Sequence, residues 1–246
     1  MTPRSNGPWS VRVDEGVTLT TSGRHAPKTT GKRGRTSVVF RKSALRYVCG
    51  MTIRVVETAD VAADAVIGDG SSIWHLAQVR EGVRMGENCV VGRGAYIGTG
   101  VTMGNGCKVQ NYALVYEPAV LEDGVFVGPS VVFTNDHFPR AINIDGSPKS
   151  ADDWHPVGVT VRRGASIGAR AVCVAPVTIG AWATVAAGAV VVKDVPNYAL
   201  MVGVPARRVG WVGESGVPLE PQGDGVFRCP QTGALYDESG GVLTPR

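Results

Sequence analysis

Residues 91–109 read VGRGAYIGTGVTMGNGCKV and contain one six-residue unit three times over. An aliphatic residue opens each unit, and a small residue follows four places later. In both directions from this stretch the unit recurs without a slip over 61–133, stops at Thr134 and returns over 161–191. Chance does not keep thirteen consecutive units in register, so this repeat decides the fold.

A period of six matches neither the 3.6-residue turn of a helix nor the two-residue alternation of a flat strand, but it is a period of parallel β-helices. Within each unit a trio such as Ala65-Val66-Ile67 forms a short strand with two side chains inside and one outside. Three units close a coil of eighteen residues, and twenty units predict six to seven coils of an all-β fold. A glycine often follows the aliphatic residue, and we expect it to adopt positive φ at a tight corner.

The repeat divides the chain into three parts. Residues 51–212 are predicted to form the β-helix domain, which a long loop at 134–160 interrupts. Its last stretch, 197–212, favours a short helix or cap, and residues 213–246 favour a C-terminal hairpin and tail. Residues 1–50 hold ten Lys or Arg against two Asp or Glu and no repeat, which predicts a disordered basic extension.

Charge and cysteine content exclude several functional classes. The net charge of +4 arises in the first fifty residues, because the remaining 196 carry 15 Lys or Arg against 19 Asp or Glu. We therefore expect no nucleic-acid partner, and no apolar run is long enough to cross a membrane. No CxxC or Cys/His spacing predicts a metal site. Cys89 and Cys107 are expected to stack in adjacent coils as buried, reduced thiols of a cytoplasmic protein.

The loop that interrupts the repeat is the candidate site of chemistry. The walls of a β-helix are flat, so a pocket needs either a loop that leaves the prism or a second subunit. His137 stands near the start of this loop, flanked by Asn135, Asp136 and Arg140. Histidine is the usual general base at neutral pH. We predict that His137 accepts a proton from an attacking amine.

Several stretches carry a resemblance to a known family. The hexapeptide array resembles the left-handed β-helix acyltransferases, and residues 164–212 resemble their coenzyme A-binding end. More narrowly, residues 71–82 (SSIWHLAQVREG), 108–136 and 138–141 (FPRA) resemble the nucleotide-amino-sugar N-acetyltransferases, nearest to those that acetylate 3-amino sugars linked to UDP or dTDP. The resemblance implies a left-handed helix, acetyl-CoA as the co-substrate and a homotrimer.

The expected site residues fall into three groups. The resemblance places Asn135 near the reacting amine, beside His137. A carboxylate can hold the sugar amine, and guanidinium groups suit a diphosphate. The residues expected to bind the nucleotide sugar are Asn111, Tyr116, Glu117, Arg140, His75, Arg80 and Arg84. Small residues let backbone amides approach the coenzyme and the oxyanion, while basic residues hold its phosphates. The residues expected to bind acetyl-CoA are Gly168, Ala169, Ala186, Ala187, Lys193, Arg207 and Arg208.

The outward positions of the strands predict how copies assemble. Tyr96, Leu114 and Val132 are eighteen residues apart and should form an apolar stripe on one face. Soluble proteins seldom leave such a stripe bare. We therefore expect this face to be the subunit interface of the threefold ring that the resemblance implies.

The predicted function is direct transfer of acetyl from acetyl-CoA to the amine of a nucleotide-linked 3-amino sugar, for a surface polysaccharide or glycan. One departure from the family is Gln78, which stands where relatives often carry a second histidine. The sequence His137-Phe138-Pro139-Arg140 is closer to the dTDP branch, whereas the CPxTGxxY tail is closer to the UDP branch. The identity of the nucleotide therefore stays open. An O-acetyltransferase acting on serine or a simple sugar, and a catalytically inactive β-helix scaffold, are the alternatives.

Overall fold

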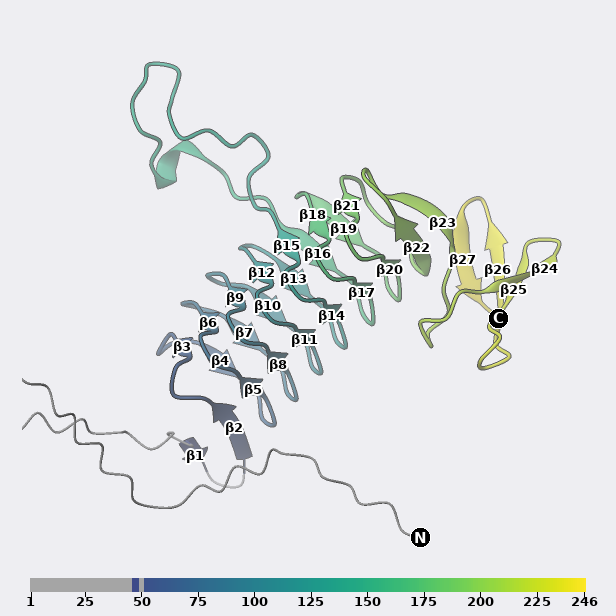
Figure 1. Ribbon diagram of the computed structural model, residues 1–246, viewed down its shortest axis with the longest axis horizontal. Helices are drawn as coiled ribbons and strands as arrows, with labels where there is room; N and C mark the ends of the chain where they lie inside the picture. The colour runs from purple at the N-terminus through teal and green to yellow at the C-terminus, as the bar shows by residue number, and fades with distance from the viewer. Residues whose placement is uncertain (1–45, 49–50) are drawn as a thin grey trace, which may run out of the picture. The chain divides into compact units, whose positions relative to one another are not determined.

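The computed structural model describes residues 46–48 and 51–246, and its strands stack as successive coils of a parallel β-helix (Figure 1). The predicted fold class is therefore confirmed. The predicted disordered extension, residues 1–50, lies outside the described residues apart from a three-residue strand. Nearly all regular structure is β, as the six-residue period requires.

Three sheets form the walls of the prism, and we number them in chain order. Sheet I contains, in spatial order, β1 (Arg46–Val48), β2 (Met51–Val55), β5 (Ser72–Ile73), β8 (Val90–Val91), β11 (Lys108–Val109), β14 (Phe126–Val127), β17 (Ser166–Ile167), β20 (Thr184–Val185), β22 (Ala199–Val202) and β23 (Arg207–Trp211). Sheet II contains β3 (Asp60–Val61), β6 (Gln78–Val79), β9 (Tyr96–Ile97), β12 (Leu114–Val115), β15 (Val132–Phe133), β18 (Val172–Cys173) and β21 (Val190–Val191). Sheet III contains β4 (Val66–Ile67), β7 (Arg84–Met85), β10 (Thr102–Met103), β13 (Val120–Leu121), β16 (Val159–Val161) and β19 (Val177–Ile179).

The register confirms the coil of eighteen residues. Leu114 lies opposite Tyr96 on one side and Val132 on the other, each eighteen residues away. The aliphatic and small positions point inward, and from Ile73 to Val191 they are buried in one continuous core. In the first coil Val61, Ala65 and Ile67 are only partly buried. Cys89 and Cys107 are buried free thiols in successive coils, as predicted.

Short turns join the sheets and form three edges of the prism. Edge I/II, between sheets I and II, consists of turns 56–58, 74–76, 92–94, 110–112, 128–130, 168–170 and 186–188. Edge II/III consists of turns 80–82, 98–100 and 116–118, the loop 134–158, and turns 174–176 and 192–194. Edge III/I consists of turns 68–70, 86–88, 104–106, 122–124, 162–164 and 180–182.

The role predicted for the first glycine of each turn is wrong. Gly92 does not have positive φ; the left-handed residue is the third of the turn, here Gly94 at φ 62°. At Gly92 a Cβ atom would lie 2.6 Å from the backbone nitrogen of Asn111 in the next coil. At Gly92 the close stacking of the coils, and not backbone freedom, therefore accounts for the glycine.

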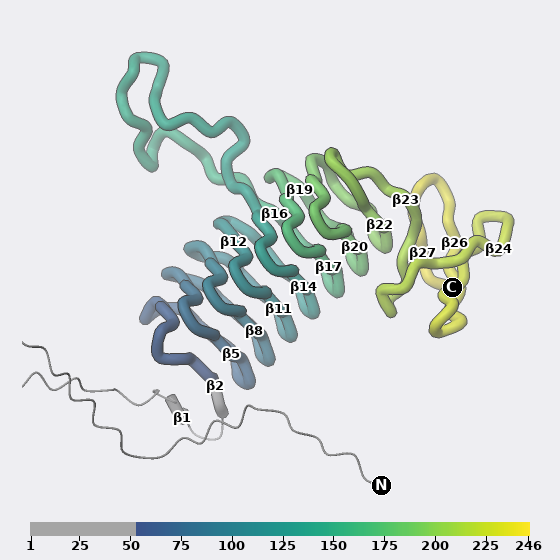
Figure 2. The backbone as a smooth tube through the Cα atoms, viewed as in Figure 1, coloured from purple at the N-terminus to yellow at the C-terminus, as the bar shows by residue number. Residues whose placement is uncertain are grey.

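The loop leaves edge II/III after β15 and returns at β16, so it spans 134–158 rather than 134–160. It projects away from the coils (Figure 2) and contains one 3-10 helix, η1 (Ala151–Asp153). Ser150 caps this helix, because its hydroxyl accepts from the Asp152 amide while Asp153 accepts from the Ser150 amide. At the base of the loop the Val157 amide donates to the Asn135 carbonyl at 3.0 Å.

Of the two alternatives predicted for 197–212, a short helix or a cap, the helix is wrong. β22 extends sheet I beside β20, and β23 pairs with β22 in an antiparallel hairpin. Ala199 and Met201 are buried while the residues between and after them are less so, which is a strand pattern that continues the core. The predicted C-terminal hairpin is present within a four-stranded sheet of β24 (Glu220–Gly223), β25 (Val226–Arg228), β26 (Leu235–Ser239) and β27 (Val242–Pro245). Over residues 46–48 and 51–246, no helix has the length and apolar character to span a membrane.

Candidate active site

The predicted site residues gather on two edges, one on each side of sheet II. Edge II/III carries Arg80, Tyr116, Glu117, Asn135, Lys193 and, on the projecting loop, His137 and Arg140. Edge I/II carries His75, Asn111, Gly168, Ala169, Ala186 and Ala187. Arg84 reaches neither edge, because it is the outward residue of β7 on sheet III.

Glu117 is the unusual residue of edge II/III. Its Oε2 atom is buried and, among the residues that the structure describes, has no hydrogen-bond partner. The carboxylate lies where Gly98 leaves space, since a Cβ atom on that glycine would come against Oε2. Asn111, at the same position of the preceding turn, instead accepts from the Arg93 amide at 2.9 Å. A buried acceptor without a partner is costly, so Glu117 is suited to bind a cationic donor.

Two tyrosines lie beside this carboxylate. The rings of Tyr96 and Tyr116 are 5.1 Å apart and tilted by 47°. Partial burial raises the pKa of Tyr96, and the negative charge of Glu117 adds to the effect. Arg80 does not neutralise Glu117, because its Nε atom donates to Glu81 at 3.0 Å. The group therefore offers one carboxylate and two phenol hydroxyls near the base of the loop.

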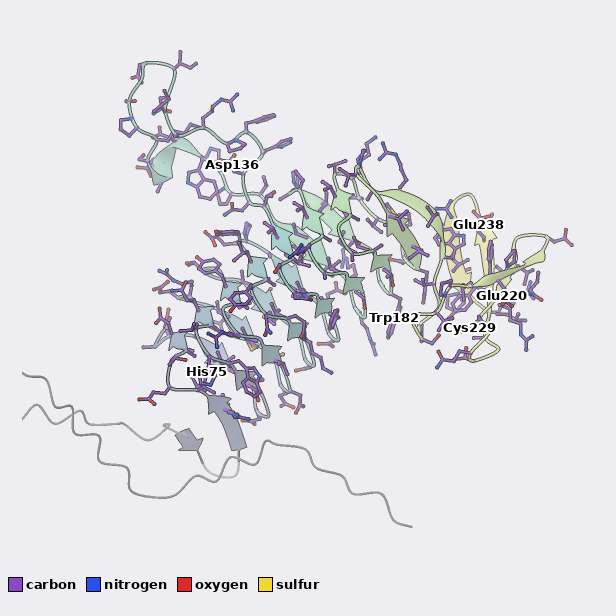
Figure 3. All side chains as sticks on the ribbon, in the orientation of Figure 1. His75, Asp136, Trp182, Glu220, Cys229 and Glu238 are labelled. Carbon is purple, nitrogen blue, oxygen red and sulfur yellow. The ribbon has the colours of Figure 1, made fainter. Side chains whose placement is uncertain are left out.

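His137 lies on the outgoing arm of the loop, just after Asp136, which Figure 3 labels. It is exposed, and its ring stacks on Phe138 with centroids 4.3 Å apart. The Phe138 amide donates to the Asp136 carboxylate at 2.9 Å, which holds the backbone turn that contains His137. Arg140 is exposed and donates to the carbonyl of its neighbour Pro139 at 2.8 Å. Asn135 lies at the base of the loop, partly buried.

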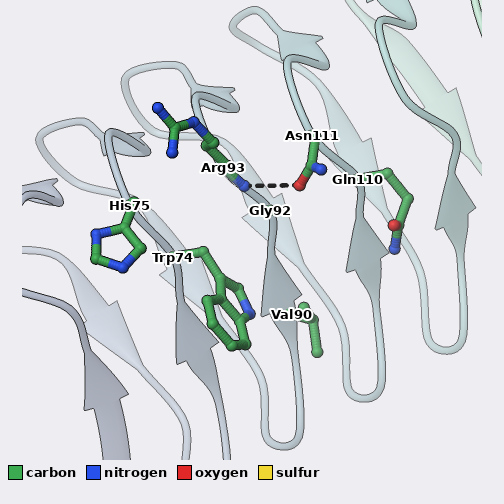
Figure 4. A pocket seen from close by; sticks show the side chains of 7 residues that line it. All are labelled: Trp74, His75, Val90, Gly92, Arg93, Gln110 and Asn111. Atoms are coloured by element: carbon green, nitrogen blue, oxygen red, sulfur yellow. Dashed lines mark hydrogen bonds between the residues drawn. The ribbon is translucent and has the colours of Figure 1, made fainter. Parts of the chain in front are cut away.

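Edge I/II contains a pocket of about 280 Å³ (Figure 4). Its lining residues are Trp74, His75, Val90, Gly92, Arg93, Gln110 and Asn111. His75 Nδ1 lies 2.9 Å from the Thr58 hydroxyl, and the Arg54 guanidinium lies over the Trp74 ring at 4.5 Å. Arg93 and Gln110 were not predicted as site residues. The eighteen-residue period contains the signal that identifies them, since Arg93 follows His75 by one coil and Gln110 follows Trp74 by two.

The residues expected to bind acetyl-CoA are brought together only in part. Arg207 and Arg208 lie on β23, which pairs with β22 directly after the last turn of edge I/II. The Arg208 guanidinium lies over the Trp211 ring at 4.0 Å, which leaves its charge exposed. Lys193 lies on edge II/III, across sheet II. Gly168 has a packing role, because a Cβ atom there would be 2.4 Å from the Ala187 nitrogen.

Between the two edges, sheet II presents the predicted apolar stripe and extends it. Tyr96, Leu114 and Val132 are in register and partly exposed. Val172 and Val190 continue the same column toward the C-terminus.

Two stretches of the chain match known repeat families. Residues 64–99 match the family described as bacterial transferase hexapeptide (six repeats), and residues 158–193 match the hexapeptide repeat of succinyl-transferase. These matches support the predicted hexapeptide-repeat acyltransferase family on both sides of the loop.

Curated relatives match over shorter segments. The chain is 38% identical over 88 residues to serine acetyltransferase of Escherichia coli, which is 35% of this chain and 31% of that protein. It is 56% identical over 52 residues to dTDP-3-amino-3,6-dideoxy-alpha-D-galactopyranose 3-N-acetyltransferase of Aneurinibacillus thermoaerophilus, which is 21% of this chain and 27% of that protein. The chain thus spans about a third of the length of these relatives. Both are acetyltransferases, which agrees with the predicted class.

Among solved structures, LpxA of Bacteroides fragilis, a UDP-N-acetylglucosamine acyltransferase, superposes with a TM-score of 0.52 at 18% identity. The match covers 65% of this chain and 61% of that one. At this identity the likeness concerns the fold alone, and it agrees with the parallel β-helix described above.

Proposed function

We propose that this protein is a cytoplasmic N-acetyltransferase that moves acetyl from acetyl-CoA to the amino group of a nucleotide-linked 3-amino sugar, for synthesis of a surface polysaccharide or glycan. The observation that carries the proposal is Glu117. Its side chain is partly exposed on edge II/III and its Oε2 atom has no hydrogen-bond partner within the described residues, so the carboxylate is suited to a substrate that brings a cationic or donating nitrogen there. The 56% identity to a dTDP-3-amino-sugar 3-N-acetyltransferase supports the same substrate class.

The chemical step is direct transfer. The amine lone pair attacks the thioester carbonyl carbon, a C–N bond forms, and the C–S bond breaks as coenzyme A leaves as its thiolate. His137 accepts the proton that the nitrogen loses and returns it to the thiolate or to water. A covalent acyl-enzyme is not required, because Cys89, Cys107 and Cys173 are enclosed in the prism. Burial also raises the pKa of Cys173 to about 12, so it is a poor nucleophile.

Acetyl-CoA is proposed to lie along the C-terminal half of edge I/II. Small residues at Ala169, Ala186 and Ala187 keep the backbone accessible there, and Arg207 and Arg208 offer exposed charge for its phosphates. The amine-binding Glu117 lies on the other side of sheet II. We therefore propose that a homotrimer packs sheet II of each copy against the next and brings edge I/II of one copy to edge II/III of another.

A second candidate, O-acetylation of serine, has one specific observation in its favour. The match to serine acetyltransferase covers 88 residues, more of this chain than the amino-sugar match does. The two functions differ at Glu117, because a carboxylate that binds the attacking amine has no such role when the nucleophile is a hydroxyl.

Release of free coenzyme A thiol from acetyl-CoA tests the proposal. The acceptors are UDP-3-amino-glucuronate, dTDP-3-amino-6-deoxyhexoses, a 4-amino analogue, serine and buffer alone. Turnover with one 3-amino nucleotide sugar is the expected result and also identifies the nucleotide. Turnover with serine alone overturns it. No turnover together with no binding of acetyl-CoA favours the scaffold alternative, whereas binding of acetyl-CoA without turnover points to another acceptor and contradicts the 3-amino-sugar proposal.

The base is tested with His137→Asn. Loss of a general base lowers kcat by about 10²–10⁴-fold. His155→Asn, on the returning arm of the same loop, is the matched control and is expected to leave kcat unchanged. Equal effects of the two variants would show that the loop, rather than the His137 imidazole, is what matters.

A further inference from the structure

Edge I/II differs from the other edges in charge. Its first turn, 56–58, holds Glu57 one coil before His75, whereas the six turns from Trp74 to Gly188 contain no Asp or Glu and have Arg93 and Arg170 as their full positive charges. Edge II/III, by contrast, includes Glu117. A surface strip with one sign of charge attracts ligands of the opposite sign. From Trp74 onward, edge I/II is therefore suited to polyanions.

The pocket in the N-terminal half of this edge combines three kinds of surface. The Trp74 ring and Val90 are apolar; the Arg54 guanidinium covers one face of the Trp74 ring at 4.5 Å, so a planar ligand ring would stack on the other face. The Gln110 side-chain amide provides one donor and one acceptor. Asn111 uses its Oδ1 atom for the Arg93 amide at 2.9 Å, so its NH₂ group is left for a ligand. With a volume of about 280 Å³ the pocket suits one moiety of a substrate rather than a whole nucleotide sugar.

Arg93 is held in place without being neutralised. Its Nε atom donates to the Tyr112 hydroxyl at 3.1 Å, and within the described residues no carboxylate lies within 4 Å of it. Tyr112 has positive φ, 58°, and its ring fills the space over Gly94, where a Cβ atom would lie 2.6 Å from it. The terminal nitrogens of Arg93 remain free for an anion.

We propose that this pocket binds the pyrimidine nucleoside diphosphate part of the acceptor, with the base against Trp74 and the diphosphate on Arg93. The assignment rests on the proposed function and names where its nucleotide lies. A pyrimidine-2,4-dione presents an acceptor–donor–acceptor edge, which the Gln110 and Asn111 amides can match. A guanidinium fork suits a diphosphate.

The coenzyme does not compete for this pocket in the proposed arrangement. Ala169 and Ala187 lie three coils beyond Arg93 and Asn111 respectively, about 14 Å at the ordinary strand spacing. The two anionic substrates would therefore occupy successive lengths of one edge, the nucleotide nearer the N-terminus and the coenzyme nearer Arg207 and Arg208.

Calorimetric titration of the full chain with dTDP, UDP, ADP and inorganic pyrophosphate tests the site without any acetyl transfer. We expect dTDP or UDP to bind more tightly than ADP and pyrophosphate. Arg93→Gln should weaken that binding by about 10- to 100-fold, the loss expected for a hydrogen-bonded charge. Gln110→Ala should weaken it less and reduce the preference over ADP. Arg163→Gln, which removes an exposed charge from edge III/I, is the control and should have no effect.

Several results would overturn the assignment. If Arg93→Gln binds dTDP and UDP as tightly as the parent does, Arg93 is not part of the site. If the variant loses ADP affinity by the same factor as dTDP or UDP affinity, this edge binds the coenzyme instead. If pyrophosphate binds as tightly as dTDP, the pocket makes no favourable contact with the pyrimidine base. If the variant loses its fold by circular dichroism, Arg93→Lys replaces it, since it keeps the charge but not the fork and should bind with intermediate affinity.

Failure of this inference and failure of the proposed function give different results. If dTDP binding depends on Arg93 but no 3-amino sugar is acetylated, the nucleotide pocket is supported and the proposed reaction is contradicted. If the parent and Arg93→Gln acetylate a 3-amino nucleotide sugar with the same KM, the proposed reaction is supported and the nucleotide pocket is contradicted.

Discussion

At the scale of single residues, two glutamates in the turns of the β-helix have different roles because their carboxylate oxygens have different partners. Glu122 accepts from the Arg163 amide at 2.9 Å and from the Arg162 guanidinium at 2.7 Å, so it ties two coils together. Glu117 has a buried oxygen with no partner. The same side chain thus stabilises the fold in one turn and offers a binding group in another.

Glu117→Gln is expected to lower kcat/KM for the amino sugar by about 10- to 100-fold, because the charge-assisted hydrogen bond to the substrate nitrogen is lost. Its Tm should be unchanged or slightly higher, since an unpartnered buried charge is removed. A marked fall in Tm together with unchanged kcat/KM would give Glu117 a purely structural role.

Glu122→Gln is the matched control and should lower Tm while leaving kcat/KM unchanged. The hydrogen bonds from Arg163 and Arg162 lower the pKa of Glu122, so their stabilisation is present at neutral pH. It is lost as the pH falls below the usual glutamate range, and the difference in Tm from the parent should narrow there. Thermal unfolding followed by circular dichroism at several pH values measures this.

Two glycines of one turn should respond differently to alanine. At Gly104 a Cβ atom would lie 2.7 Å from the Asp123 backbone nitrogen, whereas at Gly106, with φ 66°, nothing lies within 4 Å. Gly106→Ala should cost about 1–2 kcal/mol, the strain of the left-handed region. Gly104→Ala should cost more, because two coils must separate. Denaturant titration compares them, and equal losses would contradict the steric role given to the first turn position.

At the scale of elements, the loop is an insertion into one turn. Deleting 136–157 joins Thr134 and Asn135 to Gly158, a three-residue turn like 98–100. Residues 136–156 contribute no buried side chain, and of the deleted residues only Val157 packs against the core, partly buried. We expect the shortened protein to stay folded with a small loss in Tm and to keep its acetyl-CoA binding but to lose acetyl transfer, because His137 is gone. Calorimetry and the thiol assay measure both, and retained turnover would exclude the loop from the chemistry.

The sequence predicts these elements well where the period applies and poorly where it ends. Because residues eighteen apart stack, the period alone gives each strand its partners and places the loop on one edge. It does not distinguish the two turn positions that prefer glycine, since Gly92 and Gly94 differ only in backbone angle and contact. Beyond Val191 the period stops, and the hairpin of β22 and β23 depends on sheet I being available to pair, which no local pattern shows.

The site was predictable only as a set of residue types. The period assigns Asn111 and Glu117 to successive edges, but sheet II then separates them within one copy. Whether they serve one substrate depends on contacts between copies, which a repeat does not encode. Arg93 was missed because a single Arg among small residues has no motif of its own.

At the scale of the whole molecule, the apolar face of sheet II predicts the assembly. Leu114→Arg is expected to convert a trimer to monomers, because a buried charge without a partner is strongly unfavourable in an apolar interface. Val120→Arg places the same change on the outward face of sheet III and is the control. Light scattering measures the mass of each, and an unaltered mass for Leu114→Arg would remove sheet II from the interface.

The first coil is less buried than the coils that follow it, so we expect unfolding of the β-helix to begin there. In a solenoid each coil is stabilised only by its neighbours, so unfolding can begin at an end and proceed inward. Val61, Ala65 and Ile67 are partly exposed, whereas the core is sealed from Ile73 onward and the last coil is covered by β22 and β23. Amide hydrogen exchange should therefore be fastest in the first coil and spread toward Trp74 before it reaches Arg207. A molecule frayed in this way would still hold coenzyme A while it no longer held a nucleotide.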